Sequence, residues 1–137
     1  MPILVDTNVI IDVVTDDPVW SDWSISQLGE NAESGLTINP AIYAELSYGF
    51  ESQAQVDDVV RHFGLFYQET SRLGLFNAAR AYRKYKKLAG SKRHVLPDFF
   101  IGGHAEAMEI PLLTRDDSRY RTYFPTVQLI CPDPGSS

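Results

Sequence analysis

Short, mainly apolar runs recur along the chain and constrain its fold more than any other feature. Ile3–Val5 is fully apolar, and Leu36–Ile38 and Leu112–Thr114 each contain threonine as their one polar residue. Strands that are buried on both faces of a sheet have this composition. Longer segments with helical spacing separate the runs, and strands that alternate with helices indicate a parallel sheet. We therefore predict an α/β protein, a three-layer α/β/α sandwich with a central parallel sheet.

Turn and capping residues give the other elements. Two more strands are predicted at Leu65–Tyr67 and Val127–Ile130, and Asn39 is expected to cap a helix that starts at Pro40. The expected helices cover roughly residues 6–15, 20–32, 40–50, 53–63, 71–89, 96–108 and 118–123. Gly102 and Gly103 lie in an apolar helix, where they allow a second backbone to come close. The neighbouring His104 is expected to serve packing or to lie at the surface.

The composition fits one ordinary domain. The chain has 137 residues, of which 44% are hydrophobic and 22% charged. We predict a single domain over residues 1–131 and a flexible tail over 132–137, which is rich in proline, glycine and serine. A single cysteine, Cys131, excludes a disulfide framework. With no leader-like start and no apolar stretch near the ~18 residues of a membrane span, we expect a cytoplasmic protein that does not enter a membrane.

Four acidic residues lie at the carboxyl ends of predicted strands or near the starts of predicted helices. They are Asp6, Glu45, Asp98 and Asp116. Each alone also fits a helix cap or a solvated side chain, but ligands of parallel α/β sheets bind at this end of the strands. Carboxylates gathered there repel one another unless a cation neutralises them. Carboxylate oxygens suit Mg²⁺ or Mn²⁺, and such sites commonly catalyse phosphate-ester chemistry.

The order and spacing of these motifs resemble the PIN-domain ribonucleases of the VapC toxin type. The segments that carry the resemblance are Asp6-Thr7-Asn8-Val9-Ile10-Ile11-Asp12, Ala44-Glu45-Leu46 with Gly49, Pro97-Asp98-Phe99-Phe100-Ile101 with Ala105, and Leu113-Thr114-Arg115-Asp116 with Phe124. The resemblance extends from Ile3 to about Ile130. It implies an Mg²⁺- or Mn²⁺-dependent endoribonuclease that hydrolyses phosphodiester bonds in structured RNA, acting as the toxin of a type II toxin–antitoxin pair.

The resemblance also implies which residues form the site. The metal ligands and catalytic acids would be Asp6, Glu45, Asp98 and Asp116, and the supporting polar residues are Thr7, Asn8 and Thr114. Asp117 is an alternative to Asp116, because the two are adjacent. Either Asp98 or Glu45 could deprotonate the attacking water, and the sequence fits one metal ion or two. Asp12 is expected to be a solvated surface residue.

Basic residues concentrate in one segment although the net charge is −6. Eight of the 12 Lys and Arg residues lie between Arg72 and Arg93, and no acid occurs between Thr70 and Pro97. Such a run is either a solvated helix face or a surface for RNA phosphates or an acidic antitoxin segment, with Tyr82 and Tyr85 available to stack on bases. We predict RNA contacts for Arg80, Arg83, Lys84, Lys87, Lys92, Arg93 and Arg115. Arg115, Arg119 and Arg121 form a smaller patch beside Asp116, where they could neutralise that acid or contact RNA.

The resemblance implies two protein partners, a cognate antitoxin and a second copy of the chain in a homodimer. Apolar residues on the helices could serve either contact; they are Trp20, Trp23, Phe50 and Phe63. Three other kinds of protein place acids in a similar way but fit this sequence less well. A phosphatase of the haloacid-dehalogenase type needs an acid where this chain has Asn8, a phosphate-receiver domain needs a late lysine that is not found, and a flap-type nuclease needs added domains. A non-catalytic PIN-like scaffold that binds RNA or protein stays open.

Overall fold

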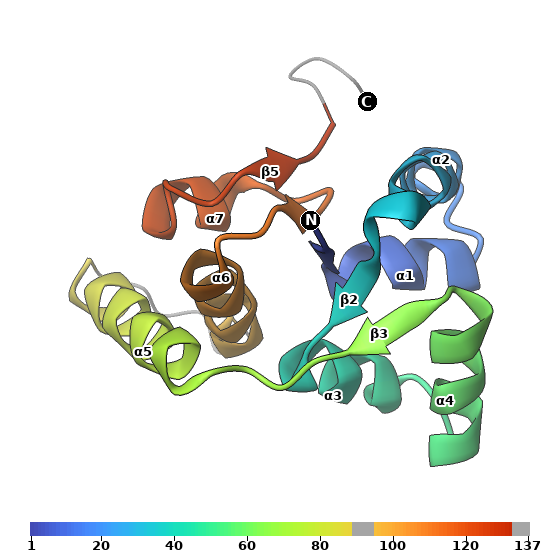
Figure 1. The fold of residues 1–137 in the computed structure, drawn as a ribbon, viewed down its shortest axis with the longest axis horizontal. Coiled ribbons are helices and arrows are strands. Elements are labelled where there is room, and N and C mark those ends of the chain that lie inside the picture. The colour runs from blue at the N-terminus through green and yellow to red at the C-terminus, as the bar shows by residue number, and fades with distance from the viewer. Residues whose placement is uncertain (89–94, 133–137) are drawn as a thin grey trace.

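The computed structural model describes residues 1–88 and 95–132. Over these residues, five parallel strands form one sheet in the order β3-β2-β1-β4-β5, flanked by seven α-helices (Figure 1). The strands are β1 (Ile3–Val5), β2 (Leu36–Ile38), β3 (Leu65–Tyr67), β4 (Leu112–Leu113) and β5 (Leu129–Ile130). The helices are α1 (Thr7–Val14), α2 (Ser21–Asn31), α3 (Pro40–Tyr48), α4 (Gln53–His62), α5 (Arg72–Lys87), α6 (Leu96–Met108) and α7 (Ser118–Tyr123), and a 3₁₀ turn, η1 (Ala32–Ser34), follows α2.

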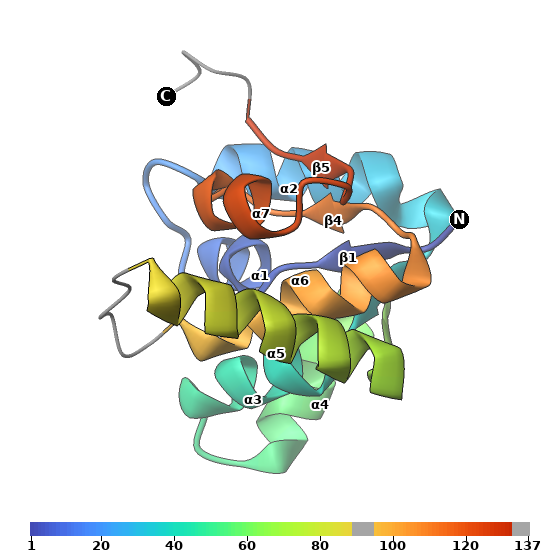
Figure 2. The same cartoon turned by 90° about the vertical axis from the view of Figure 1, so that its left-hand side faces the viewer.

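The helices form layers on both sides of the strands. Figure 1 places α5 and α6 on one side and α1 and α2 on the other, and Figure 2 shows β1 and β4 between α6 in front and α2 behind. The predicted three-layer sandwich with a parallel sheet is confirmed. None of the helices in the described part of the chain is long and apolar enough to cross a membrane.

The three central strands, β1, β2 and β4, are short and buried, as their apolar composition predicts, whereas β3 and β5 at the edges of the sheet are partly exposed. The side chains of Leu4, Val5, Ile38, Leu112 and Leu113 have no exposed surface. Because β1 pairs with both β2 and β4, it lies in the middle of the sheet. The residue that follows β1 is therefore held from both sides.

Most predicted elements are confirmed, with ends that differ by a few residues. Helix α2 stops at Asn31 because the next residues tighten into η1. Strands β4 and β5 each have two residues, fewer than the predicted Leu112–Thr114 and Val127–Ile130. The entry into α3 is as expected: the Asn39 side chain accepts a hydrogen bond from the backbone N–H of Ile42 at 3.0 Å. The predicted end of the helix at residue 89, and residues 133–137 of the predicted tail, lie outside the described residues.

Helices α5 and α6 approach closely at two glycines, as the paired glycines of α6 predict. A Cβ atom on Gly103 would lie 2.4 Å from the carbonyl oxygen of Gly74 and 2.8 Å from the backbone nitrogen of Ala78. The neighbouring His104 is fully buried and forms a hydrogen bond with Thr70 through Nδ1. Of the two roles expected for His104, packing is therefore the correct one.

Replacing Gly103 with Ala is expected to destabilise the protein strongly. The added methyl group would overlap backbone atoms of α5, which cannot move away as a flexible side chain can. Overpacking of this kind costs about 1–3 kcal/mol or more. Thermal or urea unfolding of the variant measures the loss.

The matched control is Gly29→Ala in α2, where an added Cβ meets nothing within 4 Å. This change removes a flexible residue from an exposed helix and is expected to stabilise the protein by up to about 1 kcal/mol. Equal stability of the two variants would contradict the close approach of α5 and α6.

Candidate metal centre

Asp6 stands at the carboxyl end of the central strand. Its backbone N–H donates to the carbonyl of Leu113 in β4 at 2.8 Å, so the sheet itself fixes the residue. The side chain is 4% exposed and makes no capping bond to α1. Among the described residues, three side chains donate to the same oxygen, Oδ2: Thr114 Oγ1 at 2.9 Å, Tyr120 OH at 2.9 Å and Asn8 Nδ2 at 3.4 Å. Asp6 is therefore the N-cap residue of α1 by position, but its buried, oriented carboxylate does not cap the helix.

The surroundings of Asp6 disfavour its charged form. Burial raises the pKa of Asp6 from 3.8 to about 7, and the charges of Asp98 and Glu45 add to the increase. Hydrogen bonds from Thr114 and Tyr120 act in the opposite direction but do not cancel it. A buried carboxylate beside other carboxylates ionises readily only when positive charge is brought to it. Such surroundings suit a site that takes up a cation.

Glu45 reaches the same end of the sheet from α3. Thr7, the first residue of α1, donates from Oγ1 to Glu45 Oε1 at 2.6 Å and so links the two helices. Burial raises the pKa of Glu45; the hydrogen bond from Thr7 lowers it, and the charge of Asp98 raises it further. Thr7 thus orients a second acid, whose charge raises the pKa of Asp6.

Asp98 lies in the first turn of α6, and the cap of that helix is Val95. Asp98 is therefore not a cap, although its position after a proline also allowed that role. Arg119 Nη1 donates to Asp98 Oδ2 at 2.6 Å, and the Tyr120 hydroxyl lies 3.5 Å from Oδ1. Burial raises the pKa of Asp98, and the Arg119 guanidinium lowers it. Tyr120 has a single hydroxyl proton, and the shorter distance assigns that proton to Asp6. The hydroxyl also lies within 3.5 Å of Asp98, so it bridges the two acids.

Asp116 is exposed in the loop between β4 and α7. Its backbone N–H donates to Thr114 Oγ1 at 3.1 Å, which ties the loop to the hydroxyl that also holds Asp6. The charge of Asp116 raises the pKa of Asp98. The adjacent Asp117 instead pairs with Arg121 one helical turn later. Of the two alternatives, the structure brings Asp116 into electrostatic contact with the other acids.

The four acids interact electrostatically but do not form a closed ligand shell. Over residues 1–88 and 95–132, no three His, Cys, Asp or Glu side chains are close enough together to hold a metal ion. Mg²⁺ suits an open arrangement, because it keeps several waters and commonly takes only one or two carboxylates from the protein. Asp6, which is buried, and Asp98, which is partly buried, both have a raised pKa and supply such oxygens. The donor set therefore fits a hydrated divalent cation.

Comparison with known proteins gives the family of this chain. Residues 3–125 match the model of the PIN domain family. The chain belongs to the PIN domain family. No curated protein sequence matches it significantly.

Solved structures with the same fold include two complexes. VapBC2 from Rickettsia felis, bound to a DNA fragment from its promoter, has a TM-score of 0.75 and 20% identity, and the match covers 97% of this chain and 100% of that chain. DNA-bound VapBC from Salmonella typhimurium has a TM-score of 0.71 and 18% identity, and covers 96% of this chain and 98% of that chain. At these identities the similarity shows the PIN fold alone.

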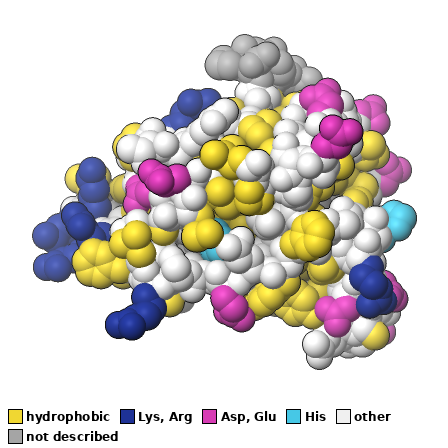
Figure 3. All heavy atoms as spheres, in the orientation of Figure 1, with side chains coloured by type: hydrophobic (Ala, Val, Ile, Leu, Met, Phe, Trp, Pro, Cys, Tyr) yellow, Lys and Arg dark blue, Asp and Glu magenta, His cyan; other side chains and the backbone are white. Residues whose placement is uncertain are grey.

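The cations that we predicted to contact RNA have different surroundings in this PIN domain. Four are exposed on α5, and Figure 3 shows basic side chains gathered over that helix; they are Arg80, Arg83, Lys84 and Lys87. Lys92 and Arg93 lie outside the described residues. Tyr85 is buried and its ring centroid lies 5.4 Å from that of Phe99, so it does not offer a face to RNA; that prediction was wrong.

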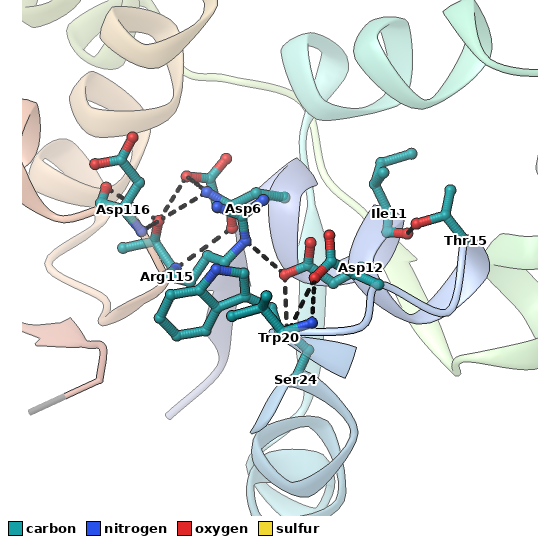
Figure 4. Close-up of polar contacts among 12 residues, drawn as sticks. Asp6, Ile11, Asp12, Thr15, Trp20, Ser24, Arg115 and Asp116 are labelled. Carbon is teal, nitrogen blue, oxygen red and sulfur yellow. Dashed lines mark hydrogen bonds and ion pairs between the residues drawn. The ribbon is translucent and has the colours of Figure 1, made fainter. Parts of the chain in front are cut away.

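Arg115 and Asp12 do not have the surroundings that the sequence indicated. Asp12 was expected to be solvated, but it is 2% exposed, because α2 packs over this part of α1. Arg115 donates from Nε to Asp12 Oδ2 at 2.7 Å, as Figure 4 shows. The expectation for Asp12 was wrong, and Arg115 is committed to a buried partner that the sequence did not indicate.

Sequence reasoning also missed Tyr120 and the partner of Arg119. Tyr120 is fully buried, and its hydroxyl is the donor shared by Asp6 and Asp98. No sequence signal indicated this role, because Tyr120 is 114 residues from Asp6 and 22 residues from Asp98 in the chain. Arg119 was expected to neutralise Asp116 or contact RNA, but it pairs with Asp98.

Replacing Asp6 with Asn is expected to stabilise the metal-free protein more at pH 8 than at pH 5. Because the pKa of folded Asp6 is about 7 and its ordinary value is 3.8, the folded protein binds more protons than the unfolded chain between these pH values. The wild-type contribution to stability therefore falls as pH rises through this window. At about 1.4 kcal/mol per pKa unit, the upper limit is about 4 kcal/mol.

Thermal unfolding in EDTA at pH 5, 6.5 and 8 measures this difference. Asp117→Asn is the matched control, because its carboxylate takes part in a surface ion pair. If the stability gained by Asp6→Asn does not grow with pH, Asp6 is ionised in the metal-free protein and the account of its surroundings fails.

Proposed function

We propose that this chain is the toxin of a type II toxin–antitoxin pair, a VapC-type endoribonuclease that uses Mg²⁺ or Mn²⁺ to hydrolyse phosphodiester bonds in structured RNA. The observation that carries the proposal is the pair formed by the buried Asp6 and the partly buried Asp98 at the carboxyl end of the sheet, bridged by Tyr120. Membership of the PIN domain family supports it. The similar fold of the toxin–antitoxin complexes is consistent with the same role.

The proposed metal ligands are Asp6, Glu45, Asp98 and Asp116. A bound Mg²⁺ or Mn²⁺ would lower the pKa of a water molecule and offset charge that develops on the phosphate. Tyr120 and Thr114 hold Asp6 Oδ2, which leaves Oδ1 as the oxygen that faces a ligand among the described residues. The Asn8 amide donates to both Asp6 and Thr114, so it helps to fix the positions of these two side chains.

Glu45 is the better candidate for the general base. Its pKa is raised by burial and by Asp98, and its hydrogen-bond donor among the described residues, Thr7, is a neutral hydroxyl. Burial raises the pKa of Asp98 as well, but the Arg119 guanidinium pairs with Asp98 and acts in the opposite direction. In this assignment Glu45 takes a proton from the attacking water, and Thr7 fixes the oxygen that does not receive it. Arg119 lies at the edge of the site, where its remaining N–H groups can donate to a phosphate.

The RNA backbone is proposed to follow the basic face of α5. Arg80 and Lys84 line a hollow of about 270 Å³ together with Asn77 and Tyr123 of α7. Arg80 and Lys84 lie one helical turn apart and supply two positive charges for RNA phosphates, and Tyr123 gives the hollow an aromatic wall, although Glu106 also lines it.

The antitoxin is proposed to occupy an apolar groove beside the acids. This groove, of about 670 Å³, lies between α3 and α6 and has Glu45 in its wall. Its other lining residues are Ala41, Ala44, Tyr48, Leu96, Pro97 and Phe100. A chain laid along it would cover Glu45 and block access of RNA. The four residues first considered for this contact, Trp20, Trp23, Phe50 and Phe63, are partly buried. A homodimer is part of the proposal, with the exposed Leu73 and Phe76 of α5 available for it.

Antitoxin-free protein is expected to cut cellular RNA at discrete sites when Mg²⁺ or Mn²⁺ is present. Glu45→Gln and Asp98→Asn are expected to lower the rate by about 10²–10⁴-fold, the range for losing a general base, and EDTA should abolish cutting. Asp116→Asn should reduce the rate, whereas the neighbouring Asp117→Asn should not. Sequencing of the new RNA ends gives the cleavage sites.

The four variants need matched folding by circular dichroism before their rates are compared. No cutting by folded wild-type protein with bound metal would favour the non-catalytic scaffold. Equal loss in Asp116→Asn and Asp117→Asn would contradict the assignment of the fourth acid.

Removing Arg80 and Lys84 together, each to Ala, is expected to raise KM for RNA without changing kcat. Each lost contact to single-stranded RNA should reduce the slope of log affinity against log salt by about 0.7. Lys86→Ala is the matched control: it lies on the same helix, but its ammonium faces the ring of Tyr82, 5.7 Å from the centroid. If Lys86→Ala raises KM as much as the double change, the α5 charges act only through the general field of the protein.

A further inference from the structure

Asp12 is a buried charge that the proposed chemistry does not use. It lies in the second turn of α1, is 2% exposed, and faces α2. Two donors reach its Oδ2 atom: Arg115 Nε at 2.7 Å and Ser24 Oγ at 3.1 Å (Figure 4). An ionised carboxylate is tolerated at such depth only when it is paired and hydrogen-bonded. Arg115 is thus the partner that the burial of Asp12 requires.

Arg115 is held at three points, all of them in the first part of the chain. Its side chain pairs with Asp12, its guanidinium lies 5.6 Å from the centre of the Trp20 ring, and its backbone N–H donates to Asn8 Oδ1 at 3.4 Å. The Arg115 side chain is 29% exposed, so it is partly covered by the protein and partly open to solvent. These contacts fasten the segment after β4 onto α1 and the start of α2.

The residues on either side of Arg115 both belong to the candidate metal centre. The preceding residue, Thr114, donates to Asp6 Oδ2, and the following residue is Asp116. Apart from its backbone bonds with Thr114, the exposed Asp116 is bonded through its carboxylate to Ser118 Oγ at 3.4 Å, among the described residues. The carboxylate of Asp116 is therefore only weakly fixed by its own hydrogen bonds. The nearest strong anchor on its loop is Arg115.

We propose that the Asp12–Arg115 ion pair is a positioning device that sets Asp116 for the metal centre, and that Arg115 is not an RNA contact. The inference rests on the proposed function of that centre and deepens it. Turning Arg115 toward a phosphate would leave the carboxylate of Asp12 buried without a cation, which is strongly unfavourable. Neither Asp12 nor Arg115 touches the reacting atoms; both act through Asp116.

The test compares Mn²⁺ affinity, measured by isothermal titration calorimetry without RNA, with kcat and KM for RNA cleavage. Arg115→Ala and Asp12→Asn are each expected to weaken Mn²⁺ binding by about 10–100-fold, the range seen when a residue that orients a ligand is lost. Asn keeps the shape of Asp and can still accept from Ser24, so this variant is expected to fold. Arg115→Lys should not restore affinity, because an ammonium cannot reproduce the Nε geometry and the stacking on Trp20.

Two further variants separate positioning from general loss of structure. Arg115→Ala combined with Asp116→Asn should bind Mn²⁺ no more weakly than Asp116→Asn alone, because both changes remove the same ligand. Arg61→Ala is the matched control, since it removes an arginine from an exposed ion pair on α4. It should leave metal affinity and cleavage at wild-type values.

The outcomes are distinct. If Arg115→Ala raises KM alone, with wild-type Mn²⁺ affinity, and Arg115→Lys restores KM, Arg115 is an RNA contact and the proposal is overturned. Fully additive losses in the Arg115/Asp116 double variant, or a wild-type protein that binds no Mn²⁺, overturn it as well. If the wild type binds Mn²⁺ but cuts no RNA, the proposed nuclease function fails, while the affinities of the variants still decide the role of the ion pair.

Discussion

The buried carboxylate of Asp6 is the constraint on which the rest of the site depends. It stands at the end of the central strand, and Thr114 and Tyr120 donate to it from segments that follow the fourth strand. A charge at this depth is unfavourable without partners, so the fold supplies donors on one oxygen and places a second acid, Asp98, nearby. The remaining parts, including the Arg119 pair and the Thr7 bond, offset the same concentration of negative charge.

The parts of this arrangement that follow from chain direction could be predicted from sequence. A parallel sheet puts the carboxyl ends of its strands along one edge, so the acids after Ile3–Val5 and after Leu112–Thr114 had to lie on the same side. The apolar runs, the Asn39 cap and the two glycines of α6 are local signals of the same kind. These signals depend on interactions within a few residues, so a single sequence is enough to predict them.

Contacts that depend on how two helices pack could not be predicted in this way. Asp12 has the spacing of a surface residue on α1, and it is buried only because α2 returns over it and brings Ser24 to its carboxylate. Arg119 and Tyr120 are neighbours on a short helix, and which acid each one meets depends on the angle at which α7 meets α6. The partners of these side chains depend on tertiary geometry, and no pattern in the sequence indicates them.

The topology of the sheet also bears on how the protein is made. Among the strands that the structure describes, β1 comes first in the sequence, and its pairing with β2 needs only residues up to Ile38. Its other neighbour, β4, and the two donors that hold Asp6 come from near the C-terminus. A chain still emerging from the ribosome therefore has its first acid long before it has the residues that orient it. The full set of hydrogen bonds around Asp6 therefore forms only after α7 has been synthesised.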